Sequence, residues 1–132
     1  LSLMGQRLFF PPSVAGWAGG RSWINTSTLF ARQNTVVYLL TGRRPSGTDP
    51  LAEREPYDPG PLLRAMDGEE DGASRDPEKA AAFLLRLCLG KAEERHVQPL
   101  GRHCRENGGE VNDETVRGML ALISAMPEYQ LC

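Results

Sequence analysis

Apolar residues recur at helical spacing in the stretch between Asn25 and Gly42. When successive residues are placed 100° apart, three of them fall on one stripe: Leu29, Val36 and Leu40. Asn25 stands before the stripe, where its side-chain oxygen can accept a free amide of the first helical turn. Gly42 follows it and can adopt the left-handed conformation that ends many helices. The pattern predicts an amphipathic core helix over residues 26–41.

One polar residue interrupts this stripe. Gln33 falls in the middle of the apolar face, where a buried amide without partners would cost about 1–3 kcal/mol of folding free energy. We therefore expect Gln33 to bond backbone groups of the loop that precedes the helix. The alternative is that Gln33 contacts a ligand.

The loop before the helix is rich in glycine and tryptophan. Trp17 and Trp23 flank a run that contains two adjacent glycines and Arg21, and adjacent glycines permit a compact turn with positive φ. The structural interpretation is that both tryptophans pack on the apolar face of the helix. The functional alternative is a platform on which a sugar ring stacks, with Arg21, Asn25 and Gln33 fixing its orientation. These five residues are the candidate ligand-binding residues.

The second half of the chain carries more helical patterns. Apolar spacing predicts three further helices, over residues 77–89, 92–106 and 113–126. Asp76 and Pro77 are a typical N-cap and first helical residue, and Asn112 can cap the last of the three. Pro99 falls within the middle helix, where it predicts a kink or a restart. A short terminal turn is expected over residues 128–130.

Residues 43–76 have a different composition. They hold five prolines together with many glycines and charges, which favours an exposed, flexible connection over a core segment. Only Leu62 to Met66 are expected to form a helical turn. We expect one helical segment over residues 1–132, divided into a loop and core helix (1–42), this connection (43–76) and C-terminal helices (77–132). The predicted fold class is all-α, a small irregular helical array.

Composition and charge exclude several function classes. The chain has 132 residues, 40% of them hydrophobic, which is material for one modest core. Its net charge is −2, so no general basic surface is expected to attract nucleic acid or an anionic membrane. No apolar run reaches the length of a membrane span. Three cysteines are too few and too scattered to form a disulfide framework or zinc site.

Several short motifs carry a family resemblance. They are Gly5-Gln6-Arg7-Leu8-Phe9, Pro11-Pro12-Ser13-Val14, Gly16-Trp17, Gly19-Gly20, Trp23-Ile24-Asn25 and the closing Pro127-Glu128-Tyr129-Gln130. With these motifs the chain resembles the C-terminal part of a bacterial family, the domain of unknown function numbered 1800. Ala18 departs from the proline that members often carry after the tryptophan.

The resemblance implies a long, mostly helical protein that is often exported, and it implies no activity. On this basis we expect the chain to be the C-terminal part of a larger bacterial protein that is exported or lies in the cell envelope. The upstream part of the same protein is then an expected packing partner.

An acidic run resembles a calcium-binding loop. Asp67, Glu69, Asp71, Gly72 and Glu78 fall on positions 1, 3, 5, 6 and 12 of an EF-hand. Against calcium, glutamate at position 3 is longer than the usual Asp or Asn, and a positively charged residue lies within the loop. We interpret the run as a solvated acidic linker that leads into a helix. Calcium is the weaker alternative, and no cofactor is expected.

No catalytic set is recognisable in the sequence. His96 and His103 are seven residues apart and share a helix face with Cys104 nearby, but two histidines alone do not make a metal site. The first functional hypothesis is a binding or scaffold segment whose loop contacts a polysaccharide or a protein partner. The alternative is the C-terminal part of an extracellular hydrolase-like enzyme, in which Asn25, Arg32 or Gln33 would line a cleft shared with upstream residues.

Overall fold

The structure, a computed structural model, describes residues 9–16, 25–43, 54–69 and 72–131. Its elements in chain order are α1 (Thr26–Thr41), α2 (Gly60–Glu69), the 3-10 helix η3 (Ala73–Arg75), α3 (Pro77–Leu89), α4 (Glu94–Glu106), α5 (Asp113–Ala125) and α6 (Pro127–Gln130). The described ranges contain helices and no strand, so the predicted all-α class is confirmed.

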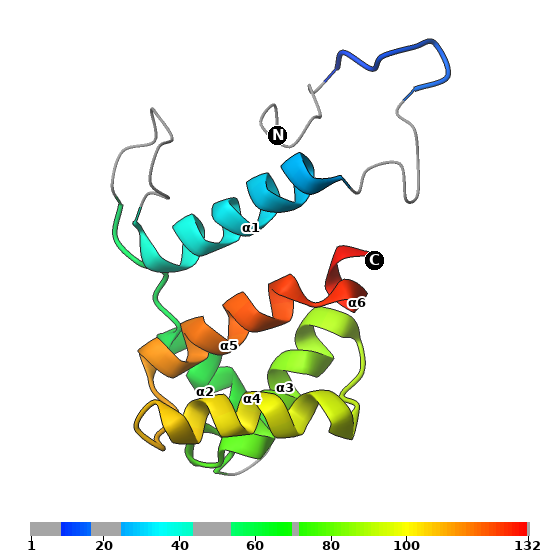
Figure 1. Ribbon diagram of the computed structural model, residues 1–132. Helices are drawn as coiled ribbons and strands as arrows, with labels where there is room; N and C mark the ends of the chain where they lie inside the picture. The colour runs from blue at the N-terminus through cyan, green and yellow to red at the C-terminus, as the bar shows by residue number, and fades with distance from the viewer. Residues whose placement is uncertain (1–8, 17–24, 44–53, 70–71, 132) are drawn as a thin grey trace.

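The helices form one packed group, and α1 lies against one side of that group. Helix α3 packs against α4 and α5, and α2 reaches this group through η3. Helix α1 lies along α5, on the side opposite α4 (Figure 1). Helix α5 is therefore the layer between α1 and the rest of the fold.

The hydrophobic core lies among α2, η3, α3, α4 and α5. Its buried residues are Met66, Ala73, Ala80, Ala81, Phe83, Leu84, Leu85, Val97, Leu100, Cys104, Val116, Met119 and Ile123. Fully burying one Leu or Met side chain stabilises a fold by about 1.5–3 kcal/mol, so this cluster supplies most of the apolar stabilisation.

Helix α1 has the predicted bounds but a different environment. Asn25 caps its start: the Asn25 Oδ1 accepts the Thr28 amide at 2.9 Å, and the Thr28 hydroxyl accepts the Asn25 amide at 3.1 Å. The predicted core helix packs on α5, and its residues lie outside the main core cluster. Leu40 is its one buried residue, at 8% exposure, whereas Phe30 is 65% exposed.

The end of α1 is fixed by a close backbone approach. Gly42 has φ of 71°, the left-handed conformation predicted for it, and a Cβ at this residue would lie 2.0 Å from the Arg54 carbonyl oxygen. The Arg54 amide bonds the Gly42 oxygen at 3.3 Å, and the Tyr57 amide bonds the Leu40 oxygen at 3.0 Å. Residues 54–57 are thus held against the last turn of α1.

The expected exposed connection contains a packed helix. In place of one turn at Leu62 to Met66, α2 runs over ten residues and buries Met66 completely. Leu62 and Leu63 pack against the core beside it, because the three residues share one helical face. Asp58 accepts the Gly60 amide at 2.8 Å at the helix start.

The C-terminal helices follow the prediction with small differences. Helix α3 has the predicted bounds and its Asp76 cap, and α5 ends one residue early, at Ala125. Helix α4 begins at Glu94, two residues late, and continues through Pro99 as one helix, so of the predicted kink or restart the restart does not occur. Buried residues on both sides of the proline hold α4 together: Val97, Leu100, Gly101 and Cys104. The short terminal turn is α6.

Truncation of Met66 tests whether α2 belongs to the core. Met66→Ala should lower the free energy of unfolding by about 2–5 kcal/mol, because the fully buried side chain leaves a cavity. Leu87→Ala is the matched control on α3, where the side chain is 60% exposed, and should change it by less than about 0.5 kcal/mol. Urea unfolding measures both. Equal effects would contradict a packed α2.

The close approach at Gly42 gives a second test. Gly42→Ala should destabilise the protein by more than about 1–2 kcal/mol, because alanine resists positive φ and its Cβ meets the Arg54 carbonyl. Gly68→Ala, in α2 with open space around the position, should be neutral or stabilise by up to about 1 kcal/mol. Thermal melts that rank the two variants in the opposite order would refute this geometry.

Candidate functional site

A polar network joins α1 to α5. The Gln33 side-chain amide donates to the Ala121 carbonyl oxygen at 3.3 Å, and its oxygen accepts the Ser124 hydroxyl at 3.4 Å. The same hydroxyl lies 2.7 Å from the Ala121 oxygen, and Ser124 is almost completely buried. Each polar group of the network therefore has a partner, as buried groups require.

The network extends to α6. The side-chain amide of Gln130 donates to the Ser124 carbonyl oxygen at 2.7 Å. The side-chain oxygen of Gln130 accepts a hydrogen bond from Arg32 Nη1 at 3.4 Å. Gln130 belongs to the closing motif of the sequence, and Arg32 follows the cap of α1 by two turns. The first and the last helix of the described residues, α1 and α6, are thus tied together.

These bonds give Gln33 partners on α5, whereas most of the loop that it was expected to bond lies outside the described residues. Its described partners, Ala121 and Ser124, lie on α5, because α1 packs against α5. Asn25 uses its side-chain oxygen to cap α1. The other candidate residues of the platform, Trp17, Arg21 and Trp23, lie outside the described residues.

An apolar hollow borders the network at the N-terminal half of α1. It has a volume of about 390 Å³ and lies between α1 and the α5–α6 junction. Its lining residues are Thr26, Leu29, Phe30, Gln33, Ala125 and Gln130. Gln33 is the one sequence-predicted site residue that borders it.

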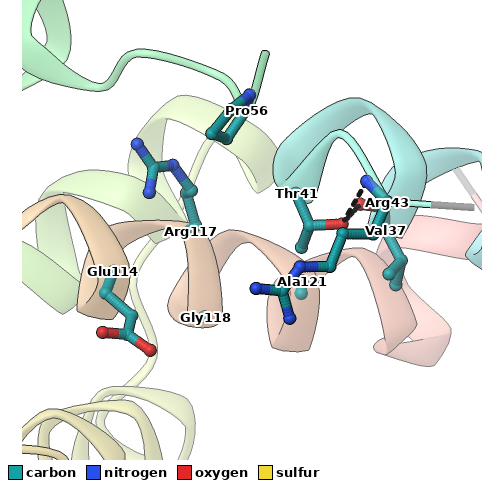
Figure 2. A pocket seen from close by; sticks show the side chains of 8 residues that line it. All are labelled: Val37, Thr41, Arg43, Pro56, Glu114, Arg117, Gly118 and Ala121. Atoms are coloured by element: carbon teal, nitrogen blue, oxygen red, sulfur yellow. Dashed lines mark hydrogen bonds between the residues drawn. The ribbon is translucent and has the colours of Figure 1, made fainter. Parts of the chain in front are cut away.

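A second hollow lies at the other end of the α1–α5 contact and is more polar. Its volume is about 470 Å³, and Figure 2 shows the side chains around it. Three separate segments line it: Val37, Thr41 and Arg43 at the end of α1, Pro56 in the following segment, and Glu114, Arg117, Gly118 and Ala121 on α5. The α1 end and residue 56 are adjacent because residues 54–57 are bonded to the last turn of α1.

Arg117 is fixed in position by the backbone across from it. Its Nε donates to the Tyr57 carbonyl oxygen at 2.6 Å, and its Nη2 lies 3.5 Å from the Asp113 carboxylate. The Arg117 side chain is 22% exposed, so it keeps an accessible edge at the hollow. The Arg43 guanidinium extends from the opposite wall toward α5 (Figure 2).

Sequence reasoning missed this polar hollow. Arg117 lies on the polar side of a predicted helix, where a charge is ordinary, and its partner Tyr57 is sixty residues away. Arg43 follows the end of the predicted helix 26–41, where a positive charge is also ordinary. No local spacing in the sequence signals that Arg43, Arg117 and Glu114 share one opening.

The residues of the possible calcium loop serve other contacts. The Asp67 carboxylate accepts the Ser74 amide at 3.0 Å and the Ser74 hydroxyl at 2.7 Å. Both bonds lower the pKa of Asp67, and the bond from the amide has the larger effect. Glu78 pairs with Arg105 of α4. Glu69 ends α2, and Asp71 lies outside the described residues. The described ranges hold no group of three or more metal-ligating side chains.

The histidines and Cys104 have separate partners. His96 Nε2 lies 3.5 Å from the Glu128 carboxylate, whereas His103 Nδ1 lies 3.3 Å from the Asn107 amide. Cys104 is buried and donates to the Glu110 carbonyl oxygen. The three side chains do not converge on one point.

Comparison with known proteins identifies a family. None of the helices in the described part of the chain is long and apolar enough to cross a bilayer. Neither curated proteins nor solved structures give a match. The family model described as protein of unknown function (DUF1800) matches residues 1–131. Because this match spans nearly the whole sequence and agrees with the resemblance of its motifs, the chain belongs to the DUF1800 family.

Proposed function

We propose that this chain is a binding segment of an exported bacterial protein, and that its ligand occupies the polar hollow between α1, residue 56 and α5. The observation that carries the proposal is the hollow itself, whose volume of about 470 Å³ lies within the range of small-ligand sites. Its lining combines an apolar floor with a few charged groups, which is the usual composition of such sites.

The chemistry of the lining favours a polysaccharide segment as the ligand. Guanidinium groups donate hydrogen bonds and a carboxylate accepts them, so Arg43, Arg117 and Glu114 together match the hydroxyl groups of a sugar. Val37 and Ala121 offer apolar surface to the C–H face of a ring. Helix α5 supplies half of the lining and is anchored in the core, which makes the site rigid.

Two other parts of the function remain proposals of the same kind. The platform of Trp17, Trp23 and Arg21 would extend the binding surface beyond the described residues. Placement at the C-terminal end of an exported protein, with upstream parts packed on α1, rests on the family resemblance. Exposed Phe30 and Leu39 on α1 support such packing. The hydrolase-like alternative is supported by no specific contact among the described residues, and we do not adopt it.

Filling the hollow tests the binding role. Isothermal titration of the intact protein against a panel of neutral and acidic polysaccharides should detect binding of at least one. Ala121→Trp should weaken that binding at least about tenfold, because the new side chain occupies the hollow. Leu122→Trp is the matched control one residue away, at an exposed position outside the lining, and should bind as the parent does.

Circular dichroism of both variants checks that the helices are retained. If the folded parent protein binds no polysaccharide of the panel, or if both tryptophan variants bind as the parent does, the proposed function is wrong.

A further inference from the structure

We infer that the polar hollow selects acidic polysaccharides, with Arg43 and Arg117 binding the carboxylate of a uronic acid unit. This inference rests on the proposed function, because it names the substrate class of the same site. Two arginines line the opening: Arg43 follows the end of α1 and extends toward α5, and Arg117 stands on α5 (Figure 2).

The two arginines differ in how far the protein already uses them. Arg117 has its Nε bonded to the Tyr57 carbonyl and its Nη2 at 3.5 Å from Asp113, a long contact that leaves Nη1 for a ligand. Within the described residues, the Arg43 guanidinium has no ion-pair or hydrogen-bond partner. Its main chain is held, since the Arg43 amide donates to the Thr41 hydroxyl at 3.2 Å. A carboxylate bound at the opening would receive charge-assisted bonds from these arginines, which are stronger than bonds between neutral groups.

The hollow also carries one carboxylate, and this decides between classes of anion. Glu114 lines the opening on α5, one turn before Arg117. A free sulfate ion has no hydroxyl group to donate to Glu114. A uronic acid unit carries both the carboxylate that Arg43 and Arg117 bind and the ring hydroxyl groups that donate to Glu114.

The uncharged lining fits the remaining part of the same unit. Val37, Pro56 and Ala121 contribute apolar surface around the opening, where the C–H groups of a pyranose ring would lie. The net charge of the whole chain is −2, so general electrostatic attraction does not draw acidic polymers to it. Binding of a polyuronate therefore requires a local site.

The test compares polygalacturonate with the same polymer after full methyl esterification, by titration calorimetry on the intact protein. The parent protein should bind polygalacturonate at least about tenfold more tightly than the esterified polymer, because the ester removes the anion. Arg43→Gln and Arg117→Gln should each weaken polygalacturonate binding by about tenfold. Arg102→Gln, the same charge change at an exposed position on α4, should leave it unchanged.

Since Arg117 also holds the Tyr57 carbonyl, Arg43→Gln is the variant that separates binding from folding. Polyglutamate serves as a peptide source of carboxylates and should bind at least about tenfold more weakly than polygalacturonate, because it lacks ring hydroxyls.

The other outcomes contradict either the selection of acidic units or the proposed function. If both polymers bind equally and Ala121→Trp still abolishes binding, the selection of acidic units is wrong while the proposed function stands. Equal losses in Arg43→Gln and Arg102→Gln would show nonspecific attraction, and polyglutamate binding as tight as polygalacturonate would assign the site to acidic peptides. If no polysaccharide binds, both the inference and the proposed function fail.

Discussion

The packing of α5 on both of its sides is the constraint on which the rest of the structure depends. One side inserts Val116, Met119 and Ile123 into the core. The other side carries α1, which has no other large contact with the packed helices. Since the main core cluster of the described residues contains no residue of α1, the position of α1 depends on α5 and on a small number of polar bonds. Both hollows exist because α1 lies on α5 as a separate layer.

Polar bonds determine the register of that layer. Apolar side chains alone would allow α1 to slide along α5, because dispersion and burial are not directional. Gln33 bonds the Ala121 carbonyl and the Ser124 hydroxyl, and a shift of one helical turn would leave the Gln33 side-chain amide without these partners, whereas Ser124 and Ala121 keep their own bond within α5. An unpaired buried polar group costs about 1–3 kcal/mol, so the network specifies one arrangement of the two hollows. Gly42 then turns the chain sharply enough for residues 54–57 to close the polar one.

The sequence predicts elements with local signals and fails where partners are remote. The bounds of α1 and α3 follow from their caps and closing glycines, and every one of those signals lies within a few residues of the helix end. Composition led us to expect residues 43–76 to be exposed, although Met66 is buried, because proline and glycine content says nothing about the few apolar residues between them. Gln33 predicted the need for a partner but not the identity of one 88 residues away. Arg117 gave no signal at all.

Hydrogen exchange of α1 in the Gln33→Ala variant tests the central claim, that α1 is a separate layer held on α5 by this network. Exchange measured by mass spectrometry should be faster in α1 than in α4 in the parent protein, because α1 opens without unfolding the core. The variant should accelerate exchange in α1 by about fivefold or more and leave α3 and α4 unchanged, since a lost bond of about 1 kcal/mol acts on this layer alone. Equal acceleration in α1 and α4 would contradict the account, because it would make α1 part of one cooperative core.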